Sequence, residues 1–156
     1  MRDSWDEVWL NVAIDISKRS NCTGRQVGAV IVSPSNRPIA VGYNGPPANM
    51  KRPVDGNCSG YCPRSGGDRG AAYDNCVSVH AEANALLFAD RDAFVDGTIY
   101  VTNPCCWGCA KLISNSGIKR VIVRKSAVDN HADVDGPVAF MQNCGLEVVV
   151  LENNNN

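Results

Sequence analysis

The sequence has no excess of positive charge and no long apolar run. Its 156 residues carry 15 Lys and Arg against 16 Asp and Glu, a formal net charge of −1. Proteins that bind nucleic acid usually show a basic patch, so we expect no nucleic-acid partner. No apolar stretch approaches the ~20 residues of a membrane span. Residues 1–9 are charged and polar, unlike the leader of a secreted protein, so we expect a cytoplasmic location.

A chain of this length usually forms one domain. Its hydrophobic content of 44% is enough for a proper core. We therefore expect a single domain over residues 1–152, followed by a disordered tail of Asn residues at 153–156.

Cysteine, in contrast, is abundant, with eight residues. Outside the secretory route, closely spaced cysteines bind metal more often than they form disulfides. One pair, Cys106 and Cys109, follows His80 and Glu82 in the chain. One imidazole and two thiolates leave the fourth position of a tetrahedral zinc open for water, as in catalytic sites. Glu82 is not needed as a ligand, so it is free to move protons to and from that water.

The spacing of these residues predicts where they lie on helices. Residues two apart on a helix do not share a face, so His80 and Glu82 converge only on a metal beyond the start of a helix. Residues 81–89 are rich in helix formers. Cys106 and Cys109, three apart, fit the first turn of a second helix, where the positive end of the helix dipole favours thiolates.

Patterning along the chain predicts an α/β layered sheet. The first helix is expected over 4–20, with an apolar face that contains Trp5 and Trp9. Two strands joined by a short turn suggest an antiparallel hairpin, and later strand–helix–strand units suggest parallel pairing. The expected strands are 27–32, 39–43, 98–102, 120–124 and 146–151, and the later helices are 80–90, one that ends near 115, and 134–143.

Residues 48–75 form a long irregular stretch rich in Gly, Pro, Asp and Arg. A loop of this length inside a compact domain is usually functional or disordered. It contains Cys58 and Cys62, and Cys76 follows directly.

The paired motifs HxE and PCxxC match the signature of the zinc nucleobase deaminases. Over about residues 5–151 the chain resembles the deoxycytidylate (dCMP) deaminases in particular. The resemblance is carried by Cys22 and residues 27–32, 42–45, 80–87, 100–102, 106–111 and 116–121. It implies a three-layer α/β/α cytidine deaminase-like fold, with a five-stranded mixed sheet and helices on both faces.

The resemblance also implies an activity, the hydrolysis of dCMP to dUMP and ammonia, which supplies dUMP for thymidylate synthesis. His80, Cys106 and Cys109 would hold zinc, and zinc-bound hydroxide would attack C4 while Glu82 carries protons. Asn44 would bind the sugar, although Asn-Gly is also a common turn pair. Tyr43 and Ala81 would also bind the substrate.

One position departs from the family pattern T-x-x-P-C-x-x-C. Cys105 fills the usual proline slot, and Pro104 precedes it. Cys105 is therefore a rival zinc ligand. We favour Cys106, because it keeps the two-residue gap to Cys109.

The resemblance implies further features. A second, structural zinc would be held by Cys22, Cys58, Cys62 and Cys76, the alternative being buried free thiols. A homohexamer regulated by dCTP, with Mg, and by dTTP is expected. The corresponding nucleotide contacts are Gly45, Phe88 and Arg91, and a solvated surface role for Arg91 remains open.

Two alternatives remain open for the function. One is a zinc deaminase of a related compound, such as 5-methyl- or 5-hydroxymethyl-dCMP, dCTP or cytidine. The other is a non-catalytic zinc-binding module, for which a free Glu82 would have no use.

Overall fold

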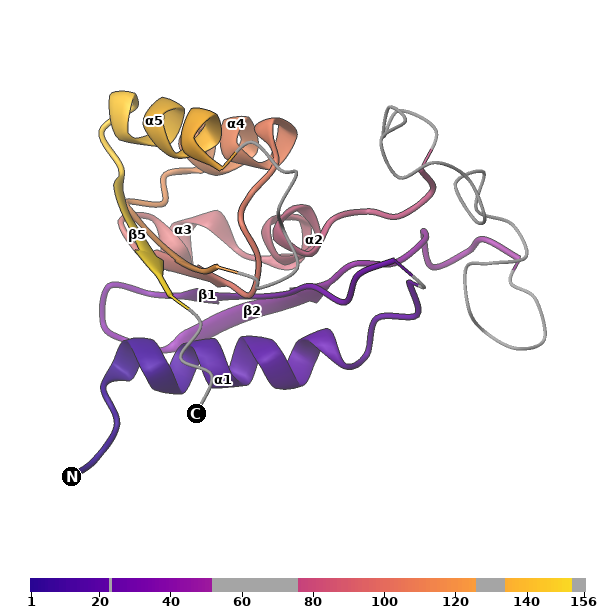
Figure 1. Ribbon diagram of the computed structural model, residues 1–156, viewed down its shortest axis with the longest axis horizontal. Helices are drawn as coiled ribbons and strands as arrows, with labels where there is room; N and C mark the ends of the chain where they lie inside the picture. The colour runs from indigo at the N-terminus through magenta and orange to yellow at the C-terminus, as the bar shows by residue number, and fades with distance from the viewer. Residues whose placement is uncertain (23, 52–75, 126–133, 153–156) are drawn as a thin grey trace.

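The computed structural model describes residues 1–22, 24–51, 76–125 and 134–152. Helices and strands alternate over most of this length (Figure 1). In chain order the elements are α1 (Trp5–Ser17), β1 (Gly28–Val32), β2 (Pro38–Tyr43), α2 (Ala81–Phe88), α3 (Arg91–Phe94), β3 (Thr98–Val101), α4 (Trp107–Ser116), β4 (Arg120–Arg124), α5 (Asp135–Asn143) and β5 (Glu147–Leu151).

The five strands form one mixed sheet in the order β2-β1-β3-β4-β5. β1 pairs antiparallel with both β2 and β3, whereas β3, β4 and β5 run parallel to one another. The predicted hairpin followed by parallel units is therefore confirmed.

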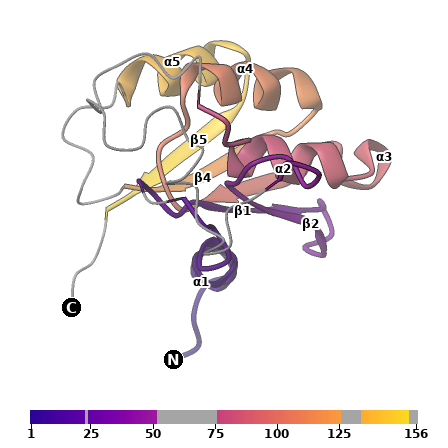
Figure 2. The same ribbon diagram turned by 90° about the vertical axis from the view of Figure 1, so that its right-hand side faces the viewer.

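Helices cover both faces of the sheet (Figures 1 and 2). α1 lies alone on one face, and the remaining helices lie on the other. Alternate strand residues serve the two layers: Val30 and Tyr100 pack with α1, whereas Ile31 and Ile99 pack with the other helices. This is the predicted three-layer arrangement. None of the helices in the described part of the chain has the length and apolarity that a bilayer crossing requires.

The structure differs from the sequence prediction at the end of α2. A single helix over 80–90 was expected, but Ala89 is extended and the chain then starts the short helix α3. Asp90 caps α3 by accepting a hydrogen bond from the Asp92 N–H. A residue that favours helix N-caps, placed inside a run of helix formers, starts a new helix here.

α1 also buries a slightly different face from the expected one. Leu10 is fully buried beside Trp9 and Ala13, whereas Trp5 is 60% exposed and stacks on Trp9.

A cluster of polar side chains connects the start of α1 to the sheet. Asp6 accepts two hydrogen bonds of 2.8 Å from the Arg120 guanidinium and one of 2.8 Å from the Tyr100 hydroxyl.

The cluster of Asp6, Tyr100 and Arg120 should stabilise the fold less at acidic pH than at neutral pH. The hydrogen bonds from Arg120, more than any other contact, hold the pKa of Asp6 below its ordinary value. Asp6 therefore stabilises the fold above its unfolded pKa of about 3.9, and that stabilisation is lost as the pH falls through its lower, folded pKa. We expect Asp6→Asn to lower the free energy of unfolding by about 1–3 kcal/mol at pH 7 and by less near pH 3. Urea unfolding at the two pH values measures this difference.

Asp15→Asn is the matched control for that measurement. Asp15 lies on the same helix, but its side chain is 73% exposed and pairs with Lys18 one turn away. Exposed pairs of this kind contribute little. Equal losses of stability in the two variants would contradict a special role for Asp6.

Candidate active site

His80 and Glu82 lie at the start of α2. His80 is the N-cap residue, with extended backbone angles (φ −67°, ψ 153°), and its side chain makes no capping hydrogen bond. Glu82 lies in the first turn and is only 4% exposed. The predicted arrangement of the two residues around the beginning of a helix is confirmed.

The two cysteines occupy the corresponding place on α4. Cys106 is the N-cap residue, and its Sγ accepts a hydrogen bond of 3.4 Å from the Cys109 N–H. Gly117 ends the helix with a positive φ of 101°, a conformation that glycine adopts at little cost. α2 and α4 lie on the same face of the sheet (Figure 2), so their N-terminal ends can meet.

The side chains of His80, Cys106 and Cys109 converge. Nδ1 of His80 lies 3.3 Å from Sγ of Cys106 and 3.4 Å from Sγ of Cys109. The three candidate ligand atoms all lie within 4.8 Å of one another. Ordinary zinc–nitrogen and zinc–sulfur bonds in a tetrahedron place nitrogen and sulfur about 3.6 Å apart. The donor set and its spacing are therefore compatible with one zinc ion.

The charge distribution within this group also suits a cation. The Cys109 side chain and His80 donate hydrogen bonds to Cys106 and lower its pKa to about 3. The same bond to Cys106, together with burial, raises the pKa of Cys109. The bond to Cys106 also raises the pKa of His80. Metal binding to these side chains would release protons, because thiolate and neutral imidazole are the forms that bind a metal.

Glu82 lies against the same group. Burial raises the pKa of its carboxyl group, and a hydrogen bond with the Cys109 side chain partly opposes that rise. A buried carboxyl group with a raised pKa beside metal-ligand side chains is typical of an acid–base catalyst.

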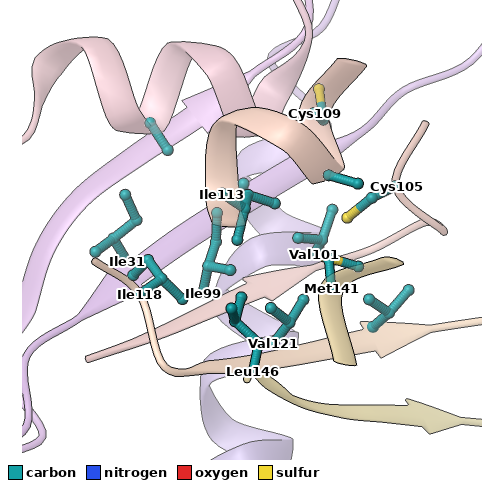
Figure 3. Close-up of a cluster of buried hydrophobic side chains, with 14 of the residues drawn as sticks. Ile31, Ile99, Val101, Cys105, Cys109, Ile113, Ile118, Val121, Met141 and Leu146 are labelled. Carbon is teal, nitrogen blue, oxygen red and sulfur yellow. The ribbon is translucent and has the colours of Figure 1, made fainter. Parts of the chain in front are cut away.

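Cys105 lies outside this ligand group. It is 5% exposed and belongs to the apolar cluster beneath α4, where Figure 3 shows it at the same end as Cys109. The three converging ligand atoms belong to His80, Cys106 and Cys109, and burial raises the pKa of the Cys105 thiol well above its ordinary value. The geometry therefore favours Cys106 over Cys105.

The segment from Gly42 to Gly45 runs beside the start of α2. Gly45 and Val79 exchange two backbone hydrogen bonds, of 3.1 and 2.8 Å, directly before His80. Ala81, fully buried, packs its carbonyl against Gly42. A Cβ atom at Gly42 would lie 2.2 Å from that oxygen, so only glycine allows this approach. The expected proximity of this segment to the HxE motif is thus present.

Asn44 is engaged mainly with the backbone. Its side-chain oxygen accepts a hydrogen bond of 2.8 Å from the Val27 N–H, and its Nδ2 donates one of 2.9 Å to the Arg25 carbonyl. The residue is 7% exposed, whereas its neighbour Tyr43 is 39% exposed. Asn44 therefore braces the start of β1, a role the sequence interpretation did not include.

A model of the cytidine and deoxycytidylate deaminase zinc-binding region matches residues 3–125 of this chain. The chain belongs to this deaminase family. The deoxycytidylate deaminase of Mycobacterium phage D29 is 42% identical in an alignment of 133 positions that covers 81% of this chain and 98% of the phage protein. That of Schizosaccharomyces pombe is 41% identical in an alignment of 152 positions that covers 94% of this chain and 44% of the yeast protein.

Solved structures agree on the fold. The apo crystal structure of dCMP deaminase from cyanophage S-TIM5 superposes with a TM-score of 0.72 at 24% identity, covering 97% of this chain and 100% of the phage chain. The five-stranded mixed sheet with helices is thus the cytidine deaminase-like fold.

The family resemblance also singled out four further cysteines and Arg91. Cys58 and Cys62 lie outside the described residues, while Cys22 and Cys76 are free and half-buried, so the four-cysteine site stays a prediction. Arg91 donates from Nε to the Ser116 carbonyl at 2.9 Å, and thereby caps the C-terminal end of α4. The C-terminal end of α4 lies about 15 Å from its N-terminal end, where Cys106 is, because each residue of an α-helix adds about 1.5 Å.

Asn84 was missed by the sequence interpretation. It lies one turn after His80, and its Nδ2 donates a hydrogen bond of 2.8 Å to the Tyr43 carbonyl. An asparagine among the good helix formers of residues 81–87 was the available signal, because asparagine is a poor helix former without a side-chain partner.

Proposed function

We propose that this chain catalyses the hydrolysis of dCMP to dUMP and ammonia. The convergence of His80, Cys106 and Cys109 beside a buried Glu82 carries the proposal. Membership of the cytidine and deoxycytidylate deaminase family supports it, as does the name of the Mycobacterium phage relative. A cyanophage relative of the same fold was crystallised with dCMP and dUMP.

His80, Cys106 and Cys109 would hold one zinc ion in this proposal. Their 3.3 and 3.4 Å nitrogen–sulfur separations support that assignment. Bound zinc lowers the pKa of a water molecule toward neutrality, which makes a nucleophile available at neutral pH. Three protein ligands leave the position that such a water needs.

Glu82 carries the protons of the reaction. It accepts one proton from the attacking water and delivers it to the ring nitrogen N3 of cytosine. It then passes the second water proton to the amine at C4. The C4–O bond forms, the C4–N bond breaks, and ammonia leaves. Burial favours this shuttle, since the raised pKa of Glu82 eases protonation at neutral pH.

Asn44 is the proposed contact to the sugar. Its two hydrogen bonds to residues 25–27 use one of the two amide N–H groups and one acceptor position. Within the described residues, one N–H group and one acceptor position of this amide are left for a hydroxyl group. Tyr43 and Ala81 are the other proposed substrate-binding residues, beside Asn44.

The structural zinc at Cys22, Cys58, Cys62 and Cys76 remains a separate proposal. It is supported by the cysteine spacing in the sequence. Metal analysis of the purified protein should give two zinc ions per chain. One zinc, with all four thiols open to alkylation in the folded state, would contradict it.

Regulation and assembly are likewise proposed. A homohexamer controlled by dCTP with Mg and by dTTP would use Gly45, Phe88 and Arg91 near subunit boundaries. The side chain of Phe88 is 80% exposed and that of Leu87 is 72% exposed, which suits a contact with a second copy of the chain. The rate of ammonia release is measured against dCMP concentration with and without dCTP or dTTP, and the molecular mass of the protein is measured in solution. A hyperbolic dependence on dCMP that neither nucleotide changes would contradict regulation.

A substrate panel tests the main proposal. Ammonia release is measured with zinc-loaded protein on dCMP, 5-methyl- and 5-hydroxymethyl-dCMP, dCTP and cytidine, with dCTP or dTTP added in parallel. Selective turnover of dCMP is expected. Faster turnover of another substrate would move the assignment to that compound, and no turnover of any would favour the binding-module alternative.

A further inference from the structure

Asn84 links two segments that form different sides of the proposed site. Its backbone N–H bonds to the His80 carbonyl at 2.9 Å, as the first regular hydrogen bond of α2. Its side chain reaches back to the Tyr43 carbonyl at 2.8 Å. One residue thus holds both the helix start that carries His80 and the end of β2.

The Tyr43–Gly45 segment is also held beside the start of α2 by backbone contacts. Gly45 and Val79, which lies directly before His80, exchange two backbone hydrogen bonds, and Gly42 packs against the Ala81 carbonyl. With the bond from Asn84 to the Tyr43 carbonyl there are three such hydrogen bonds in the described part of the chain, and the Asn84 bond is the one made by a side chain. It joins the segment at Tyr43, whereas the Val79 pair joins it at Gly45. Together the three bonds leave the segment little freedom to slide along the start of the helix.

The cost of asparagine at this position supports a purpose for the bond. Asparagine is among the weaker helix formers, and alanine is the best. The other residues of α2 are mostly alanine, leucine and glutamate. The helix itself therefore gains nothing from Asn84, and its side-chain amide serves the neighbouring segment.

We propose that Asn84 is a positioning residue for substrate binding, because it fixes the register of residues 43–45 against His80 and Glu82. The inference rests on the proposed function, in which Asn44 contacts the sugar. Asn84 acts through that segment and touches none of the reacting atoms. Its loss should weaken the binding of dCMP while leaving the metal and the proton carrier in place.

Asn84→Ala tests this role, since alanine keeps the helix. We expect the KM for dCMP to rise about 3- to 10-fold, the effect of one lost hydrogen bond, with kcat within about twofold. Zinc content should be unchanged, and the melting temperature should stay within about 3 °C of the parent. Hydrogen exchange at the Gly45 and Val79 amides should become about tenfold faster, since a less constrained segment opens more often.

Asn115→Ala is the matched control. Asn115 is exposed on α4, the helix that presents Cys106 and Cys109, and its loss should change neither KM nor the exchange of those two amides. Asn84→Asp keeps the size of the side chain but removes the donor, so it should also speed exchange at Gly45 and Val79.

The outcomes separate cleanly. Parental KM and parental exchange in Asn84→Ala would overturn the inference, as would parental exchange in Asn84→Asp. Equal falls in kcat and zinc content would show a merely structural role and would also overturn it. If the parent protein released no ammonia from dCMP, the proposed function would fail instead. The exchange rates at Gly45 and Val79 would still report whether Asn84 holds the segment.

Discussion

Replacing Glu82 by Gln is expected to lower kcat for dCMP by about 10²- to 10⁴-fold, the usual contribution of a positioned acid–base group. Glutamine has nearly the same shape, so the packing around this 4% exposed side chain should persist. Its amide cannot take a proton from water and return it to the substrate. Zinc content should equal that of the parent, because His80, Cys106 and Cys109 remain.

Glu147→Gln provides the control for charge removal. Glu147 begins β5, and its side chain is 64% exposed beside Arg120. Deamination should be unchanged in this variant. If Glu82→Gln retained parental turnover, the proton-carrying role would be wrong and the non-catalytic alternative would gain support. The measurement is steady-state ammonia release, with zinc determined on the same samples.

The second large effect is expected from a pair of adjacent cysteines. Cys106→Ser should weaken zinc binding by more than about 100-fold, since loss of a mere outer-shell partner typically costs 10- to 100-fold. Turnover should fall with it. Cys105→Ser should keep zinc and turnover, but should lower the free energy of unfolding by about 1–3 kcal/mol, because it buries a hydroxyl group in an apolar cluster.

The two variants check each other, because they differ by one position in the chain. Zinc titration and urea unfolding of both proteins give the comparison. The reverse pattern, with metal lost only in Cys105→Ser, would make Cys105 the ligand and Cys106 a bystander.

The sheet and the placement of the two half-motifs could be predicted because both have local causes. Strand patterning gave the hairpin and the parallel units. The two-residue spacing of His80 and Glu82 required a helix start. The N-cap positions of His80 and Cys106 confirm that argument.

Contacts between distant residues could not be predicted in the same way. The Asp6–Arg120 pair spans 114 positions and the Asn84–Tyr43 bond spans 41, and neither has a repeating pattern. Arg91 shows the same limit. The family resemblance implies a nucleotide contact for Arg91, and the structure adds a hydrogen bond from its guanidinium to the carbonyl of Ser116, which is adjacent only in the folded chain.

The pairing of β1 with β3 has a consequence for how the protein acquires metal. Gly28 and Thr102, 74 positions apart, are joined by a hydrogen bond just before the segment that carries Cys106 and Cys109. The folded arrangement around His80 and the two cysteines includes this distant pairing, and distant pairings form slowly during folding. Metal that binds this folded arrangement more tightly than the unfolded chain stabilises the fold. A free zinc concentration 100 times the dissociation constant would then add about 2.7 kcal/mol to the folding free energy, and a chelator would remove that gain.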